Sequence, residues 1–266
     1  MGIIIRNNRC LNLREVSPSP LIMGHLGIAV VTGGSRGIGA SICERLAEDG
    51  YRILLTYNRN SQPAEDVVDR IRSKGGDAFA VRVDCTNLSE VYILGQHPWV
   101  ESGVEALVLN HGRYDRTRAD LLKPEELELT MKTNFEGAYH VWNALSKNLS
   151  NTARIVVIGS QLGIKGSPHG ADYSASKAAL HAWARSLAQA VGPKGQRVNI
   201  IAPGYVDTDI LAGDSKERRL LREEEVPLRR IGTPTDISGV ASFLVNNDSA
   251  YVNGSIIHVN GGLYLP

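Results

Sequence analysis

Two residues with complementary proton chemistry stand four positions apart, Tyr173 and Lys177. On a helix, side chains at positions i and i+4 project from the same face, one turn apart. A tyrosine with a pKa near ~10 exchanges protons poorly at neutral pH, but a neighbouring ammonium favours the phenolate and lowers that pKa. The pair is therefore a candidate acid/base for a reaction at a substrate oxygen. Because this spacing is common by chance, two unrelated surface residues are the alternative interpretation.

Two polar residues upstream could complete a catalytic site. Ser160 follows an apolar run that ends at Ile158, and it precedes Tyr173 by thirteen residues. Its hydroxyl could hydrogen-bond a carbonyl oxygen and stabilise negative charge that develops there. Asn134 stands in the middle of a predicted helix. The candidate catalytic residues are therefore Asn134, Ser160, Tyr173 and Lys177.

A glycine-rich loop, Thr32–Gly39, follows the first apolar run and opens an amphipathic helical pattern. Glycines let the backbone approach a pyrophosphate, and a helix N-terminus offers it unpaired N–H groups and partial positive charge. A plain strand-to-helix turn is the alternative, but the placement favours a dinucleotide. The absence of a Lys-Ser/Thr ending excludes an ATPase-type phosphate loop. The candidate cofactor contacts in this loop are Gly33, Ser35, Arg36, Gly37, Ile38 and Gly39.

The end of the second predicted strand indicates which dinucleotide is bound. A carboxylate there would bind the ribose hydroxyls of NAD and repel a 2′-phosphate. This chain has Tyr57 at that position. Arg36 and Arg59 could hold the phosphate through bidentate hydrogen bonds, although both could instead be solvated surface residues. The residues therefore favour NADP(H) over NAD(H).

Composition excludes several other classes of protein. The net charge is +1, from 29 basic and 28 acidic residues, so no overall field favours nucleic acid or an anionic membrane. No apolar run approaches the ~20 residues of a membrane span. Cys10, Cys43 and Cys85 are odd in number and lack metal-site spacing, which predicts no metal site and favours a reducing, cytoplasmic location.

The chain is predicted to fold as a flexible N-terminal tail, 1–24, and one catalytic domain, 25–266. A targeting or docking role is the alternative for the tail. Short β-branched apolar runs alternate with helical patterns from Gly27 onward, which predicts a single-domain, doubly wound parallel sheet with helices on both faces. About seven strands are expected, at 28–31, 52–56, 78–83, 106–109, 154–158, 197–202 and 255–259. Helices are expected after the glycine loop and at 64–73, 124–149, 171–191 and 235–245. The charged segment 205–230 is typical of a mobile lid or a solvated helix.

From about Leu26 to Pro266, the order of these motifs resembles the short-chain dehydrogenase/reductase family, an α/β fold of the Rossmann type. The resemblance implies that Asn134, Ser160, Tyr173 and Lys177 form a catalytic tetrad. It also implies that Tyr173 and Lys177 contact the cofactor, with Lys177 holding the nicotinamide ribose, and that Asn134 anchors a water relay. Some relatives only sense the cofactor, so a non-catalytic dinucleotide-binding module is an alternative of a different class.

The resemblance implies further cofactor contacts at the ends of the third, fourth and sixth strands. Asp84 would contact the adenine, with a helix N-cap role as the alternative or an addition. Where the family has Asn-Asn-Ala-Gly, this chain has Leu109-Asn110-His111-Gly112, so only Asn110 and Gly112 match. His111 is expected to be a local packing residue or to lie near the cofactor. The remaining contacts would be Pro203, Gly204, the Val206 backbone and the Thr208 hydroxyl, although Thr208 could instead be a helix N-cap.

The C-terminal half, including 226–234 and 249–254, is similar to the 3-oxoacyl-[acyl-carrier-protein] reductases. The implied reaction is NADPH-dependent reduction of a 3-oxoacyl thioester in fatty acid synthesis, with an alcohol or sugar dehydrogenase as the alternative. Lys194 stands where these reductases carry a basic residue for the carrier protein, and Asn151 stands where they often carry another. The family also implies a homo-oligomer, a tetramer or dimer. Its interface could include Trp142, Leu180, Trp183 and Leu187, for which a buried core is equally expected.

Overall fold

A computed structural model describes residues 26–266 of the chain. The predicted tail at 1–24 and Cys10 lie outside the described residues. Within 26–266, no helix is long and apolar enough to cross a bilayer. The same part of the chain contains no cluster of His, Cys, Asp or Glu side chains able to hold a metal ion.

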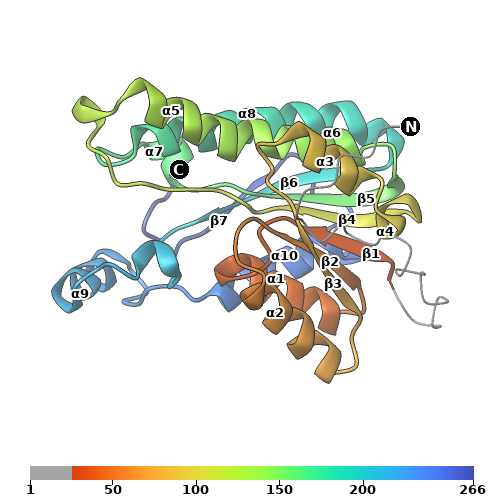
Figure 1. The fold of residues 1–266 in the computed structure, drawn as a ribbon. Helices are drawn as coiled ribbons and strands as arrows, with labels where there is room; N and C mark the ends of the chain where they lie inside the picture. The colour runs from red at the N-terminus through yellow and green to blue at the C-terminus, as the bar shows by residue number, and fades with distance from the viewer. Residues whose placement is uncertain (1–25) are drawn as a thin grey trace, which may run out of the picture.

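Seven parallel strands form one sheet in the order β3-β2-β1-β4-β5-β6-β7 (Figure 1). The strands are β1 (Ile28–Val31), β2 (Arg52–Tyr57), β3 (Ala78–Arg82), β4 (Val104–Leu109), β5 (Leu149–Ile158), β6 (Arg197–Pro203) and β7 (Ile256–Val259). Most residues of the central strands β1, β4 and β6 are buried and apolar, as a parallel sheet covered on both faces requires. In chain order, β2 and β3 are added outward on one side of β1, and the chain then crosses back so that β4 pairs with the other side of β1. This reversal places the carboxyl ends of β1 and β4 next to each other, where such sheets bind ligands.

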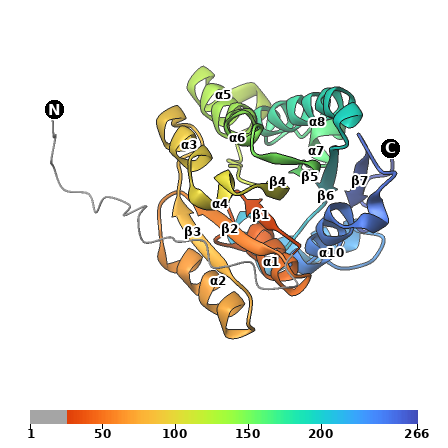
Figure 2. The same ribbon diagram turned by 90° about the vertical axis from the view of Figure 1, so that its right-hand side faces the viewer.

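Helices cover both faces of the sheet, which confirms the predicted fold class (Figures 1 and 2). One face carries α1 (Gly37–Glu48), α2 (Gln62–Ser73) and α10 (Pro234–Val245). The other carries α3 (Leu88–Gly95), α5 (Pro124–Met131), α6 (Gly137–Leu145) and α8 (Ala171–Val191). A short helix, α4 (Pro98–Glu101), precedes β4. Each face has its own hydrophobic core, so alternate side chains of the central strands enter opposite cores.

The long helix predicted at 124–149 is wrong in two respects. It is divided into α5 and α6 by a π-helical turn, Lys132–Glu136, and it ends at Leu145. Leu149 instead begins β5, where it pairs with Val104 ahead of a register shift in β4. Apolar residues continue through both elements, so hydrophobic periodicity alone does not mark the boundary.

The segment 205–233, here called the lid segment, connects β6 to α10. It contains a 3₁₀ turn, Asp209–Leu211, and the helix α9 (Lys216–Glu225). Figure 1 shows α9 projecting beyond the sheet at the same end as the short helix α7 (Leu162–Lys165). The expected charged, solvated helix is therefore present at this end of the molecule.

Candidate active site

The four candidate catalytic residues meet at the carboxyl end of the sheet. Ser160 lies just beyond β5, Tyr173 and Lys177 lie one turn apart on α8, and Asn134 lies in the π-helical turn. The Ser160 hydroxyl lies close enough to the Tyr173 phenol to lower its pKa, and the Lys177 Nζ lies 5.7 Å from the centre of the Tyr173 ring. A Cβ added at Gly112 would lie 3.2 Å from Asn134 Oδ1 and 3.7 Å from Lys177 Nζ. The sequence-predicted set is thus one spatial cluster.

The backbone and side chain of Ser160 are both held in place. Its hydroxyl accepts a hydrogen bond from the Leu162 N–H at 3.1 Å, and its own N–H donates to His181 Nε2 at 3.3 Å. His181 is buried, and this burial, with repulsion from Lys177, lowers its pKa to about 4. The imidazole is therefore neutral and can accept a hydrogen bond at Nε2. Sequence reasoning did not single out His181, although it stands one helical turn beyond Lys177.

Asn134 is completely buried and acts as a brace between three elements. Its Oδ1 accepts a hydrogen bond from the Arg113 N–H at 2.8 Å. Its Nδ2 donates to the Arg113 carbonyl and to Ser176 Oγ, both at 3.0 Å. These bonds tie the π-helical turn to the loop after β4 and to α8. The water-relay role implied by the family stays a prediction.

Burial has opposite effects on the pKa values of Tyr173 and Lys177. It raises the pKa of Tyr173 to about 12, and the hydrogen bond from Ser160 only partly offsets this. It lowers the pKa of Lys177 to about 8, and its Nζ donates to the Ile158 carbonyl at 2.7 Å. The sequence analysis expected the ammonium to lower the tyrosine pKa. The pKa of Tyr173 moves in the opposite direction, because the loss of solvent around the phenol outweighs its interaction with Ser160.

The glycine loop has the shape that a dinucleotide pyrophosphate requires. A Cβ at Gly39 would lie 2.2 Å from the Gly33 carbonyl oxygen, so the loop can close only with glycine there. Gly37 has φ +54° at the start of α1, and a Cβ there would lie 3.2 Å from Thr208 Cγ2. In the described chain, no side chain caps the first turn of α1, which leaves its N–H groups for an anionic ligand. Ser35 and Ile38 are half-buried in this loop.

Asn110 connects the end of β4 to the glycine loop. Its Nδ2 donates to the carbonyls of Thr32 and Gly33, each at 3.0 Å, and its N–H donates to Thr32 Oγ1 at 3.0 Å. His111 Nδ1 lies 2.8 Å from the same hydroxyl, and burial lowers the pKa of His111 to about 4. Asn110 and His111 therefore both stabilise the glycine loop through hydrogen bonds from the end of β4. For His111 this matches the expected local role.

Arg36 and Arg59, the two candidate phosphate ligands, are exposed near the glycine loop and β2. Arg36 forms an ion pair with Asp209 of the lid segment at 2.8 Å, with 73% and 68% of the two side chains exposed. Exposed pairs contribute only about 0–1 kcal/mol, so the Arg36 guanidinium can turn to a phosphate at little cost. Their cofactor role stays a prediction.

Asp84 lies at the end of β3, as expected for a residue beside the adenine. Its Oδ1 accepts hydrogen bonds from the N–H and hydroxyl of Thr86 at 2.9 and 2.8 Å. Burial would raise the pKa of Asp84, but these bonds outweigh it and lower that pKa. The N-cap alternative is wrong, because α3 is capped by Asn87. The adenine contact stays a prediction.

The predicted contacts after β6 lie opposite the glycine loop. The Gly204 N–H donates to the Val259 carbonyl at 3.0 Å, and the Pro203 carbonyl accepts from the Gln161 N–H at 3.2 Å. Val206 is buried. Thr208 stands at the N-cap position of the 3₁₀ turn, but its hydroxyl donates to the Val206 carbonyl at 3.4 Å instead of capping.

Known proteins resemble this chain over most of its length. A family model described as "Enoyl-(Acyl carrier protein) reductase" matches residues 33–264. The 3-oxoacyl-[acyl-carrier-protein] reductase of Staphylococcus aureus (strain Mu50) is 36% identical over 249 residues, which cover 89% of this chain and 98% of that protein. The chain belongs to the short-chain dehydrogenase/reductase family. It is accordingly an oxidoreductase.

Other family members extend the similarity to solved structures. A dehydrogenase/reductase from Sinorhizobium meliloti superposes with a TM-score of 0.86 at 33% identity, covering 91% of this chain and 96% of that one. A short-chain dehydrogenase from Burkholderia cenocepacia, solved in complex with NADP, gives a TM-score of 0.84 at 32% identity, covering 90% and 98%. A mycobacterial relative, the 3-oxoacyl-[acyl-carrier-protein] reductase of Mycobacterium bovis, is 32% identical over 240 residues, 88% of this chain and 91% of that protein.

Proposed function

We propose that the protein is an NADPH-dependent carbonyl reductase whose substrate is a 3-oxoacyl thioester. The observation that carries this proposal is the convergence of Ser160, Tyr173 and Lys177 at the carboxyl end of the sheet, with the Lys177 Nζ 5.7 Å from the centre of the Tyr173 ring. Two hydroxyl groups that converge on one point can bind one carbonyl oxygen. This geometry supports a reaction in which negative charge develops on that oxygen.

When bound, NADPH supplies a hydride to the carbonyl carbon. The first turn of α1 would hold its pyrophosphate, and Arg36 and Arg59 its 2′-phosphate. Asp84 would contact the adenine, and Lys177, Val206 and Thr208 would hold the nicotinamide end. Two features of the described chain fit a dinucleotide: the closely packed glycine loop and the first turn of α1, which no side chain caps.

The residues of the site supply the proton. Ser160 donates a hydrogen bond that polarises the substrate carbonyl, and Tyr173 transfers its phenolic proton to the oxygen as the carbon is reduced. The product is a 3-hydroxyacyl thioester, and the phenolate that remains is stabilised by the Lys177 ammonium. A proton from solvent restores the phenol.

The similarity to 3-oxoacyl-[acyl-carrier-protein] reductases of Staphylococcus aureus and Mycobacterium bovis supports the thioester substrate. The position of Lys194, however, does not support a carrier-protein partner. Lys194 lies on the turn beyond the C-terminal end of α8, whereas Tyr173 lies in its first turn. A helix of this length separates the two by about 30 Å, so Lys194 does not border the active-site mouth of its own chain.

The proposal is tested by following NADPH oxidation with a panel of substrates. Acetoacetyl thioesters are compared with free ketones, sugars, simple alcohols in the reverse direction, and an enoyl thioester. We expect the highest kcat/KM for the 3-oxoacyl thioester and a preference for NADPH over NADH. Turnover restricted to sugars or alcohols would favour the alternative dehydrogenase. Consumption of the enoyl thioester alone would reject carbonyl reduction.

We also propose that the protein forms a homo-oligomer through α6 and α8. Trp142 and Trp183 lie on these helices with rings 6.0 Å apart, half-buried, beside the exposed ring of Tyr139. Leu180 and Leu187 instead belong to the buried core, so an interface role for these two is wrong. Light scattering on the eluting protein measures the assembly, and a monomer at micromolar concentration would reject it.

A further inference from the structure

Tyr114, in the loop after β4, packs directly against the catalytic tyrosine. The centres of the Tyr114 and Tyr173 rings lie 4.6 Å apart, with their planes inclined at 49°. The Tyr114 hydroxyl donates to the His169 carbonyl at 2.8 Å, just ahead of α8. A Cβ at Gly170 would lie 2.5 Å from the Tyr114 ring, so the chain before α8 fits closely around this side chain. Tyr114 therefore forms one wall of the site in which Tyr173 reacts.

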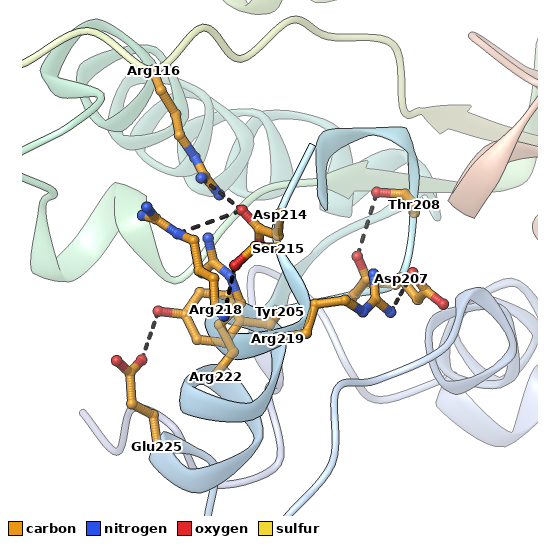
Figure 3. Close-up of polar contacts among 11 residues, drawn as sticks. Arg116, Tyr205, Asp207, Thr208, Asp214, Ser215, Arg218, Arg219, Arg222 and Glu225 are labelled. Carbon is orange, nitrogen blue, oxygen red and sulfur yellow. Dashed lines mark hydrogen bonds and ion pairs between the residues drawn. The ribbon is translucent and has the colours of Figure 1, made fainter. Parts of the chain in front are cut away.

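The lid segment reaches the same loop through one buried carboxylate (Figure 3). Asp214 accepts hydrogen bonds from Arg116 at 2.8 Å and from Arg222 of α9 at 2.6 Å, and Arg218 lies at 3.5 Å. Its side chain is only 2% exposed. We call Asp214 and these three arginines the clasp. Because Arg116 belongs to the loop after β4, the clasp joins two segments that are 98 residues apart.

Arg116 also connects the clasp to Tyr114. Partial burial would lower the pKa of Arg116, but its hydrogen bond and charge interaction with Asp214 outweigh burial and raise that pKa. The guanidinium holds the lid segment through Asp214, and Arg116 stands two residues after Tyr114 in the same loop. This short stretch of chain and the ring contact between Tyr114 and Tyr173 therefore link Asp214 to the catalytic phenol.

A second set of contacts holds α9 to the residues that follow β6. Arg222 lies over the ring of Tyr205, 4.3 Å from its centre, and the Tyr205 hydroxyl donates to Glu225 at 2.9 Å. Arg219 pairs with Asp207 at 2.9 Å. Since Tyr205 and Asp207 closely follow β6, the position of α9 is set by the end of the sheet. The clasp can therefore transmit the position of this helix to the loop after β4.

We propose that Tyr114 and Asp214 are positioning residues, and that the clasp holds the Tyr114 ring against the catalytic phenol when the lid segment is closed. In this arrangement Tyr114 excludes water from the phenol and fixes the face on which the substrate carbonyl lies. The proposal rests on the proposed carbonyl reduction. It deepens that function by naming the residues that couple the lid to the proton donor.

The test is a double-mutant cycle on Asp214→Asn and Tyr114→Phe. Asp214→Asn removes the charge that holds Arg116, and Tyr114→Phe keeps the ring but removes the hydroxyl. We expect each to lower kcat/KM on the order of 10-fold, because small displacements of reacting groups are costly. If Asp214 acts through Tyr114, the double variant is no slower than the slower single variant. Losses that multiply would overturn the proposal.

The matched control is Asp120→Asn. Asp120 is also paired with an arginine of this loop, Arg118, at 2.7 Å, but both side chains are more than half exposed and do not contact the lid segment. We expect its kcat/KM to stay within about 2-fold of the unaltered enzyme, as exposed pairs contribute little. An Asp214→Asn enzyme no slower than this control would reject the role of the clasp.

The pH profile separates positioning from a general loss of structure. The alkaline limb of ketone reduction follows the Lys177 ammonium, whose pKa is lowered to about 8 by burial. Water admitted to the site would reduce this effect of burial, so the alkaline limb should move to higher pH in Asp214→Asn. Tyr114, Tyr173 and Lys177, the titratable groups that meet at the phenol, all remain in this variant. A uniform decrease at every pH would overturn the proposal.

Hydrogen exchange keeps the inference testable without turnover. Amides of the loop 113–118 should exchange faster in Asp214→Asn than in the Asp120→Asn control. If Asp214→Asn fails to fold, Arg116→Gln replaces it, because the Arg116 side chain is more exposed than that of Asp214. The same amides should exchange faster in Arg116→Gln. Unchanged exchange in both clasp variants would reject the clasp even if the enzyme reduces no ketone. Faster exchange without ketone turnover would reject the proposed function alone.

Discussion

The phenol of Tyr173 and the ammonium of Lys177 share one buried site, and burial favours the neutral form of each. The pKa of Tyr173 is raised to about 12 and that of Lys177 is lowered to about 8. At neutral pH, Tyr173 therefore carries its proton, and Lys177 is still mostly charged. A protonated phenol beside Ser160 suits ketone reduction, in which a proton must be delivered. The reverse reaction, oxidation of the hydroxyl product, needs the phenolate, which is the less populated form of Tyr173 at neutral pH.

Tyr173→Phe tests the proton donor directly. The ring and its packing against Tyr114 are kept, but the proton is lost. We expect kcat to fall by roughly 10²–10⁴-fold, the usual contribution of a positioned acid. NADPH affinity, measured by fluorescence titration, should change little. Full turnover by this variant would leave the non-catalytic alternative or another proton donor as the explanation.

The pH dependence of ketone reduction follows from Lys177. Its pKa in the folded protein is about 8, so its charge is present below that pH and is lost as pH rises through it. A neutral lysine no longer stabilises the phenolate left by proton transfer. We expect the reduction rate to be level near neutral pH and to fall above about pH 8. A level kcat profile up to the ordinary lysine pKa of ~10.4 would contradict this assignment.

At the level of elements, the glycine loop is held by the strand next to it. Asn110 at the end of β4 donates two hydrogen bonds to the carbonyls of Thr32 and Gly33. These contacts connect β1 and β4 at the reversal in strand order. The shape of the cofactor loop therefore depends on a side chain from the neighbouring strand as well as on its own glycines.

Asn110→Ala would leave these two carbonyls without their donor. We expect the free energy of unfolding to fall by about 1–3 kcal/mol, the cost of unsatisfied buried polar groups. NADPH affinity should fall with it, because the loop loses its support. The control is Asn87→Ala, which removes the N-cap of α3 at a cost of about 1 kcal/mol. The control should lose stability while keeping NADPH affinity, and equal affinity losses in both variants would contradict the assignment.

Elements bounded by strong local signals were predicted well. The predicted helix 171–191 agrees with α8, which lies between Gly170 and Gly192. Its Tyr173 and Lys177 could therefore be assigned to one face from spacing alone. The helix predicted at 124–149 lacked such signals. Its π-helical turn and the early start of β5 at Leu149 depend on tertiary contacts that no local pattern reveals.

The clasp could not be predicted for a different reason. Arg116 and Asp214 are far apart in the sequence, and both occur in segments where charged residues are common. Nothing in composition or spacing distinguishes the buried Asp214 from the exposed acids around it. Likewise, the separation of Lys194 from Tyr173 becomes clear only when the length and direction of α8 are known.

For the molecule as a whole, the lid segment touches both flanks of the catalytic edge. Asp209 pairs with Arg36 of the glycine loop, and Asp214 pairs with Arg116 of the loop after β4. The first pair is exposed and the second is buried on the Asp214 side. The lid segment is therefore held firmly on the substrate side and weakly on the cofactor side.

NADPH should stabilise the whole domain. A ligand at a hundredfold excess over its Kd raises the free energy of unfolding by about 2.7 kcal/mol. For a domain of this size, that corresponds to a Tm increase of roughly 5–10 °C, measured by differential scanning fluorimetry. NADH at equal concentration should give a smaller increase. An equal or larger shift with NADH would contradict the proposed role of Arg36 and Arg59.

The π-helical turn at Lys132–Glu136 has a consequence for changes in chain length. Such a turn contains one residue more than an α-helical turn. Deleting a single residue here would restore a regular helix, yet it would rotate Asn134 by about 100° relative to α6. The brace to Arg113 and Ser176 would then be lost. This short stretch should tolerate many substitutions at its exposed positions but no insertion or deletion.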